Sequence, residues 1–226
     1  MDILVCLTVA VVAYFLGSIP TGYLAGVAKG IDIRVAGSGN IGATNVFRIL
    51  GITAGIIVLV VDGLKGWVAV AKVPEIVYKI YYGTSWDDQA AEMEYLRIIA
   101  GICVILGHNY TCWLKFKGGK GIATSAGVLA ALIPVTFIIG LSTWIVACLI
   151  TRYVSVASIA AAAVLPFATW GIRYFGVHYS HRMVIVAALM GALAIYKHKA
   201  NIGRLMNGTE NKLGKKKTPP PTGATP

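Results

Sequence analysis

The sequence predicts an all-α integral membrane protein with about seven transmembrane helices, some of them short. Hydrophobic residues make up 57% of the 226 residues and charged residues only 13%, which lies outside the range of a soluble domain of this size. The hydrophobic residues gather in long runs that short polar segments separate. Because about 20 apolar residues cross a hydrocarbon core roughly 30 Å thick, each long run is a candidate span.

The expected spans follow these runs in chain order. Residues 3–28, 52–73, 96–107, 153–172 and 183–196 are the clear candidates. The run at 122–150 would form a helix of about 43 Å, which is too long for one upright span. Pro134 lies inside it, so we expect two short helices that meet at Pro134 in an extracytoplasmic turn. The third and fourth helices are also short, and we expect parts of them either to pack inside the bundle or to be re-entrant.

Basic residues orient the helices. The C-terminal region is rich in lysine, and the positive-inside rule therefore places it in the cytoplasm. The first span has no basic segment before it, so we interpret it as a retained helix with its N-terminus outside. The acidic stretch WDDQAAEMEY is expected to be a solvated extracytoplasmic loop, either without regular structure or with a short helix. Residues 1–214 would form the membrane domain, and residues 215–226 a disordered basic, proline-rich tail.

Three glycine-rich polar clusters fall on the cytoplasmic side of this topology. They read GSGNIGATNVFRILG (37–51), GHNYTCWLKFKGGKGIAT (107–124) and HKANIGRLMNGTENK (198–212), and each carries at least one cation. Any one of them could be a membrane hairpin, but three on one face favour a common anion site. Glycine lets backbone N–H groups approach an anion, and a helix N-terminus adds a positive dipole.

The second cluster predicts a phosphate cradle. Gly118, Gly119 and Gly121 surround Lys120 directly before an expected helix. The segment is not a Walker loop, because Gly121 stands where that motif needs Ser or Thr to bind magnesium. A machine driven by nucleotide hydrolysis is therefore disfavoured.

Other polar residues have simpler interpretations. Asp62 and Lys65 are costly inside a span and are spaced i, i+3, so we expect an ion pair, more often structural than catalytic. We expect His108 to order its loop rather than contact a substrate, and His178 and His181 to lie in an external turn. The four cysteines are scattered, which favours neither a zinc site nor disulfides.

At its three clusters the sequence resembles the bacterial acyl-phosphate:glycerol-3-phosphate acyltransferases, small integral-membrane enzymes of phospholipid synthesis. GSGNIGATN with Arg48, KGGKGIAT and HKANIGRL occur in the family's order and spacing, although Cys112 or its neighbour Thr111 stands where the family usually has proline. The resemblance implies transfer of a fatty acyl group from acyl phosphate to the sn-1 hydroxyl of glycerol 3-phosphate. The products would be lysophosphatidate and phosphate.

The resemblance also implies the setting of the reaction. The enzyme would lie in the bacterial inner membrane with its site on the cytoplasmic side, and would use no metal or other cofactor. Its partners would be the two substrates, membrane lipid and an upstream enzyme that forms acyl phosphate, but no nucleic acid.

Site residues are assigned by the same resemblance. For acyl phosphate we expect Ser38, Asn40, Thr44, Gly118, Gly119, Lys120 and Gly121. For glycerol 3-phosphate we expect Arg48, Lys120, Ser155, His198 and Asn201. Of these, Ser38, Arg48, Lys120 and His198 would be catalytic.

We expect no side chain to act as an obligatory general base. Phosphate is already a good leaving group, and a substrate phosphate oxygen with a pKa of about 6 can take up the hydroxyl proton.

No histidine is followed five residues later by aspartate, which excludes the H-x-x-x-x-D acyltransferases. A phosphate or organophosphate transporter is the alternative, and the lack of a convincing internal repeat counts against it.

Overall fold

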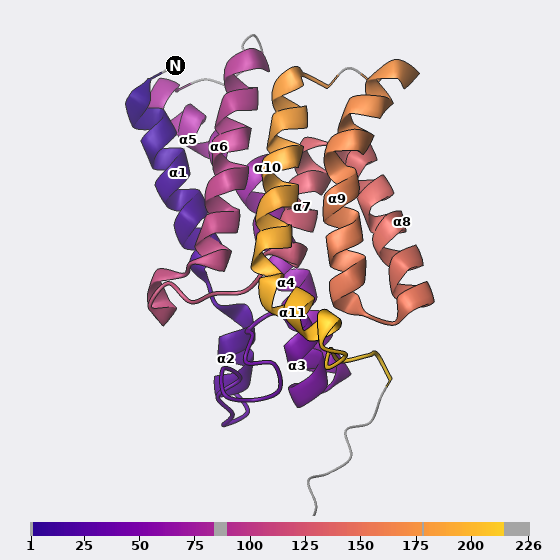
Figure 1. Cartoon of the computed structure of the whole chain (residues 1–226). Coiled ribbons are helices and arrows are strands. Elements are labelled where there is room, and N and C mark those ends of the chain that lie inside the picture. Colours follow the sequence, from indigo (N-terminus) through magenta and orange to yellow (C-terminus); the bar gives the residue numbers. More distant parts are fainter. Residues whose placement is uncertain (1, 84–89, 178, 215–226) are drawn as a thin grey trace, which may run out of the picture.

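The computed structural model describes residues 2–83, 90–177 and 179–214, and every regular element in those ranges is a helix (Figure 1). The fold class expected from the sequence is therefore confirmed for these residues. The α-helices are α1 (Ile3–Ser18), α2 (Thr21–Val27), α3 (Ala43–Leu50), α4 (Ile52–Ala71), α5 (Val73–Tyr82), α6 (Ala90–Asn109), α7 (Ile122–Leu132), α8 (Pro134–Thr151), α9 (Val154–Ile172), α10 (His181–Lys197) and α11 (Lys199–Met206). Two single 3₁₀ turns, η1 (Cys112–Leu114) and η2 (Arg173–Phe175), follow α6 and α9.

Five segments of the described chain are long and apolar enough to cross a membrane, and α10 with α11 makes a sixth if this pair, bent by 54°, counts as one span. The α7 helix is apolar but only 11 residues long. The expected number of seven, and the orientation of the two termini, therefore stay predictions. The five segments are Ile3–Val27, Ile52–Tyr82, Ala91–Leu114, Pro134–Thr151 and Val154–Phe175.

Prolines set three of the helix boundaries. The span expected over residues 3–28 is present as Ile3–Val27, but Pro20 has no N–H to donate and divides it into α1 and α2. Pro74 lies in the first turn of α5 and likewise separates it from α4. Pro134 begins α8 and divides the 122–150 run as expected, although α8, with 18 residues, is not short.

The described residues of the acidic stretch, 90–95, are helical, and they belong to a helix longer than the short one that the sequence analysis allowed for. Glu75 lies in the first turn of α5, and Glu92 and Glu94 lie in α6. The α6 helix has 20 residues, so the third span is also longer than the sequence suggested. Asp87 and Asp88 lie outside the described residues, as do His178 and the tail at 215–226.

Close helix pairs bring the polar clusters together at one end of the bundle. The α1 helix packs on α6, α4 packs on α7, and α9 packs against both α8 and α10. At the α4–α7 contact, a Cβ on Gly66 would lie 2.2 Å from the Thr124 carbonyl oxygen, so only glycine permits this approach. Figure 1 shows α2, α3 and α11 gathered at the end opposite the N-terminus.

Candidate functional site

A cavity of about 330 Å³ opens where the three clusters meet. Its wall carries four cationic side chains and, among the described residues, no aspartate, glutamate or histidine. The cavity therefore has the electrostatics of an anion site. The residues that line it are Ser38, Gly39, Asn40, Tyr110, Gly119, Lys120, Tyr196, Lys197, Lys199, Ala200, Asn201 and Arg204.

The first cluster is a loop that Asn45 holds from within α3. The buried Asn45 side chain accepts a hydrogen bond from the Ser38 N–H (2.9 Å) and donates one to the Ala36 carbonyl (3.0 Å). The Asn40 side chain accepts a bond from the Gly42 N–H (2.8 Å), which forms an Asx turn. These bonds place Ser38 and Asn40 on the cavity wall.

The second cluster folds back on the end of α6. The Gly118 and Gly119 N–H groups donate to the carbonyls of Asn109 (3.2 Å) and His108 (3.0 Å). The cradle expected from this loop thus depends on the amides that follow, those of Lys120, Gly121 and the first turn of α7. Gly121 has φ +81°, a left-handed conformation that favours glycine directly before the helix.

His108 orders this loop. The His108 ring is buried against Gly119, where an added Cβ would lie 2.1 Å from its Nε2 atom.

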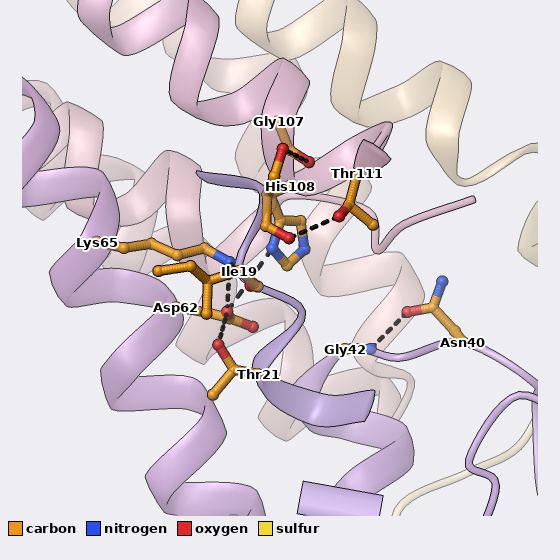
Figure 2. A network of polar contacts seen from close by, with 10 residues as sticks. Ile19, Thr21, Asn40, Gly42, Asp62, Lys65, Gly107, His108 and Thr111 are labelled. Atoms are coloured by element: carbon orange, nitrogen blue, oxygen red, sulfur yellow. Dashed lines mark hydrogen bonds and ion pairs between the residues drawn. The ribbon is translucent and has the colours of Figure 1, made fainter. Parts of the chain in front are cut away.

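The structure also forms the expected ion pair between Asp62 and Lys65, with 2.8 Å between the carboxylate and Nζ (Figure 2).

Lys120 links the second cluster to the third. Its Nζ donates to the Asn201 side chain, which in turn donates to the Glu210 carboxylate (2.8 Å). Burial, together with the nearby charges of Arg204 and Arg48, lowers the pKa of Lys120 to about 8, while Glu210 acts in the opposite direction. An anion in the cavity would relieve both the burial cost and the repulsion.

Glu210 is the residue that the sequence analysis missed. Its carboxylate accepts hydrogen bonds from Ser155 (3.1 Å), Asn201 (2.8 Å) and Arg204 (2.7 Å). Burial raises the pKa of Glu210, but the bonds from Asn201 and Arg204 outweigh it and hold the pKa below its usual value. Its one visible signal was an acidic residue inside an otherwise basic cluster.

The other expected residues lie at different distances from the cavity. Arg48 and Thr44 are exposed on α3 and do not belong to the described lining, although the Arg48 charge acts on Lys120. Ser155 is buried behind Glu210. His198 is buried at the bend between α10 and α11, with its Nδ1 atom 2.7 Å from the Ala194 carbonyl oxygen.

Two wall residues that sequence reasoning did not assign support the second cluster. The Lys197 Nζ donates to the Asn109 carbonyl (3.1 Å) and lies 4.4 Å from the centre of the Tyr110 ring.

In the part of the chain that the structure describes, His, Cys, Asp and Glu form no group of three that could hold a metal ion.

Comparisons with known proteins place the chain in one family. The sequence model of the family "Glycerol-3-phosphate acyltransferase" matches residues 7–208. Proteins of that name from Fusobacterium nucleatum and Geotalea daltonii are 41% and 42% identical to the chain; the alignments cover 90% and 88% of this chain and 95% and 93% of theirs.

Solved structures give the same result. The crystal structure of PlsY (YgiH), an integral membrane glycerol 3-phosphate acyltransferase, in its glycerol 3-phosphate form has a TM-score of 0.76 and 37% identity, over 92% of this chain and 96% of that chain. Its lysophosphatidic acid form has a TM-score of 0.73 and 36% identity, over 92% and 95%. The transporter alternative has no support in these matches, and the chain belongs to the glycerol-3-phosphate acyltransferase family of integral membrane enzymes.

Proposed function

We propose that the protein transfers a fatty acyl group from acyl phosphate to the sn-1 hydroxyl of glycerol 3-phosphate. The observation that carries this proposal is the cavity, which brings four cations and uncharged donors together at one end of the bundle. Both substrates carry a phosphate, so each needs such a wall. The crystal structures of the relative PlsY, in glycerol 3-phosphate and lysophosphatidic acid forms, support the acceptor and the product.

The second cluster, with Ser38 and Asn40, is our candidate site for acyl phosphate. Lys120 and the amides before α7 face a leaving phosphate that gains negative charge as the acyl C–O bond breaks. Fixed donors at such a place stabilise the transition state without reorganising. Thr44, in the first turn of α3, is the outermost residue that we assign to this group.

The third cluster, with Arg48, is our candidate site for glycerol 3-phosphate. The Asn201 side chain contacts both Lys120 and Glu210, so it can fix the phosphate of glycerol 3-phosphate next to the bound acyl phosphate. We assign Ser155 an indirect part through Glu210, and His198 a part in binding. The charged residues of this group, Arg48 and Lys120, hold the acceptor phosphate close to the acyl carbon, which removes much of the entropic barrier.

The proton of the attacking hydroxyl goes to a substrate phosphate oxygen in this proposal. The described wall holds no carboxylate and no imidazole, and Glu210 is engaged by Ser155, Asn201 and Arg204. A phosphate monoester with a second pKa of about 6 is a sufficient acceptor at neutral pH. The hydroxyl oxygen bonds to the acyl carbon, and the anhydride electron pair leaves with phosphate.

We also propose that the cavity faces the cytoplasm from the bacterial inner membrane. The support is the basic character of that end, where Lys197, Lys199 and Arg204 lie together. Acyl phosphates are reactive mixed anhydrides, so the chain would depend on an upstream enzyme that forms them.

The test is an assay of the purified protein in detergent. Acyl phosphate and labelled glycerol 3-phosphate should give labelled lysophosphatidate, with the acyl group at the sn-1 position by NMR. Acyl-CoA in place of acyl phosphate should give no product, and Lys120→Met should be inactive in both assays. Product from acyl-CoA alone, or acylation at sn-2, would refute the proposed donor or regiochemistry.

A further inference from the structure

A buried polar network lies next to the cavity, centred on the Asp62 carboxylate (Figure 2). Its Oδ1 atom lies 2.8 Å from Lys65 Nζ, accepts a hydrogen bond from the Thr21 hydroxyl (3.0 Å), and is 3.7 Å from His108 Nδ1. The side chains of Asp62, Lys65 and His108 are only 3%, 4% and 6% exposed. Charges buried this deeply are costly in a membrane protein and commonly serve a function.

Part of the network completes the helix break at Pro20. The break frees backbone carbonyls, and two of them have side-chain partners: Lys65 Nζ donates to the Ile19 carbonyl (3.0 Å) and the Thr111 hydroxyl to that of Ser18 (2.6 Å). Figure 2 labels Ile19, Lys65 and Thr111. Lys65 and Thr111 suffice for this structural role. The bond from Thr21 to Asp62, and the place of His108 beside it, are not needed for it.

These two remaining contacts connect Asp62 to the supports of the first and second clusters. Thr21 begins α2, and α2 packs directly under the first cluster, since a Cβ on Gly22 would lie 1.8 Å from the Ile41 carbonyl oxygen. On the other side, the His108 ring covers Gly119 and the His108 carbonyl accepts the Gly119 N–H (3.0 Å). One carboxylate thus lies between the support of the first cluster and that of the second.

We propose that Asp62 is a positioning residue that sets the first cluster against the second, and so places Ser38 and Asn40 relative to Lys120. The inference rests on the function proposed above. Buried ion pairs add little stability compared with apolar replacements, so stability alone does not account for the carboxylate. A misplacement of reacting groups by about 1 Å can cost about 100-fold in rate, so a small rotation of α2 is enough to matter.

The test removes the Thr21 hydroxyl while keeping its shape. Thr21→Val should lower kcat at least about tenfold, with each KM within about threefold of wild type, because both loops keep their own contacts but lose their relative placement. Thr169→Val is the control, since Thr169 is likewise a hydrogen-bonded threonine but lies in α9 with Leu165 and Thr136 as partners. Thr169 is fully buried whereas Thr21 is only partly buried, so the melting temperature of Thr169→Val should fall at least as much as that of Thr21→Val, with kcat unchanged.

Two further variants keep the outcome clear. Thr21→Ser, which retains the hydroxyl, should restore kcat to within about threefold of wild type. The combination of Thr21→Val with His108→Gln should cost less than the product of the two single effects, because both act through Asp62. Full additivity, a Ser variant as slow as Val, or a Thr21→Val kcat equal to that of Thr169→Val would each overturn the proposal. A wild type that forms no lysophosphatidate would instead refute the proposed function.

Discussion

Lys120 allows a sharp test of the anion site, because its charge should be lost within the pH range of the assay. Burial lowers the pKa of its ammonium group to about 8, with Arg204 as the largest contributor among its neighbours. A lysine is charged below its pKa and neutral above it, so the cavity should lose this cation as the pH rises through 8. We therefore expect a basic limb in kcat/KM for acyl phosphate.

The size of the effect follows from the titration. With a pKa of about 8, roughly one-tenth of Lys120 stays charged at pH 9 and one-hundredth at pH 10, so kcat/KM should fall about tenfold per unit. The substrate phosphate does not contribute to this fall above pH 8, because its second pKa is about 6. The assay measures initial rates of lysophosphatidate formation from pH 6 to 10, corrected for acyl phosphate hydrolysis without enzyme. Such a profile reports groups of the free enzyme.

Lys120→Arg separates this residue from its neighbours. A guanidinium stays charged throughout the range, so the basic limb should disappear even if the absolute rate drops because the shape differs. Lys199→Arg, a substitution on the same cavity wall, should keep the limb at about pH 8. A wild-type profile that stays flat to pH 10, or a limb that persists in Lys120→Arg, would refute the assignment.

Four further predictions test other parts of the structure. Gly119→Ala should raise KM for acyl phosphate at least about tenfold, because its Cβ would lie 2.1 Å from His108 Nε2; an unchanged KM would contradict this. His198→Gln should keep kcat within about tenfold of wild type and raise KM for glycerol 3-phosphate. A fall in kcat of about 10² to 10⁴ at saturating substrate, together with loss of the acidic limb of the pH–rate profile, would instead make His198 the base. Glu210→Gln should lower the free energy of unfolding by about 1.5–3 kcal/mol in denaturant titrations, since it weakens a charged hydrogen bond to Arg204, and an unchanged midpoint would count against that bond. Lys212→Cys in a cysteine-free background should react with an impermeant maleimide only after the cells are opened; labelling of intact cells would place the C-terminus outside.

The sequence predicted the helices well where the apolar runs have clear ends, and less well where composition hides a break. Pro20 interrupts an apolar run that continues on both sides, so hydropathy alone joined α1 to α2. The residues after Val73 looked like loop because they are acidic, although Pro74 at a helix start and Gly83 at a left-handed helix end (φ +71°) are signals of α5. Local signals should therefore outweigh composition in such segments.

The candidate site was predictable in its parts and not in its connections. The three clusters and Lys120 stand out because glycine next to lysine in an apolar chain needs an explanation. Glu210 does not stand out in the sequence, because its role depends on the 54° bend between α10 and α11. This bend returns the chain to Ser155, which lies 55 residues earlier. A contact of that separation is set by helix packing, which a single sequence does not show.

The placement of Lys120 is itself an argument for a ligand. A lysine that loses solvent lowers the stability of the fold unless a partner compensates, and the burial that lowers the pKa of Lys120 outweighs the opposite effect of Glu210. Glu210 is shared among Ser155, Asn201 and Arg204, so it neutralises Arg204 more directly than it does Lys120. The cations of the cavity wall thus repel one another, and the surrounding residues do not fully offset this repulsion. Such a departure from ordinary burial is expected where a bound anion supplies the missing charge, and a phosphate dianion bound as we propose would do so for Lys120 and Arg204 at once.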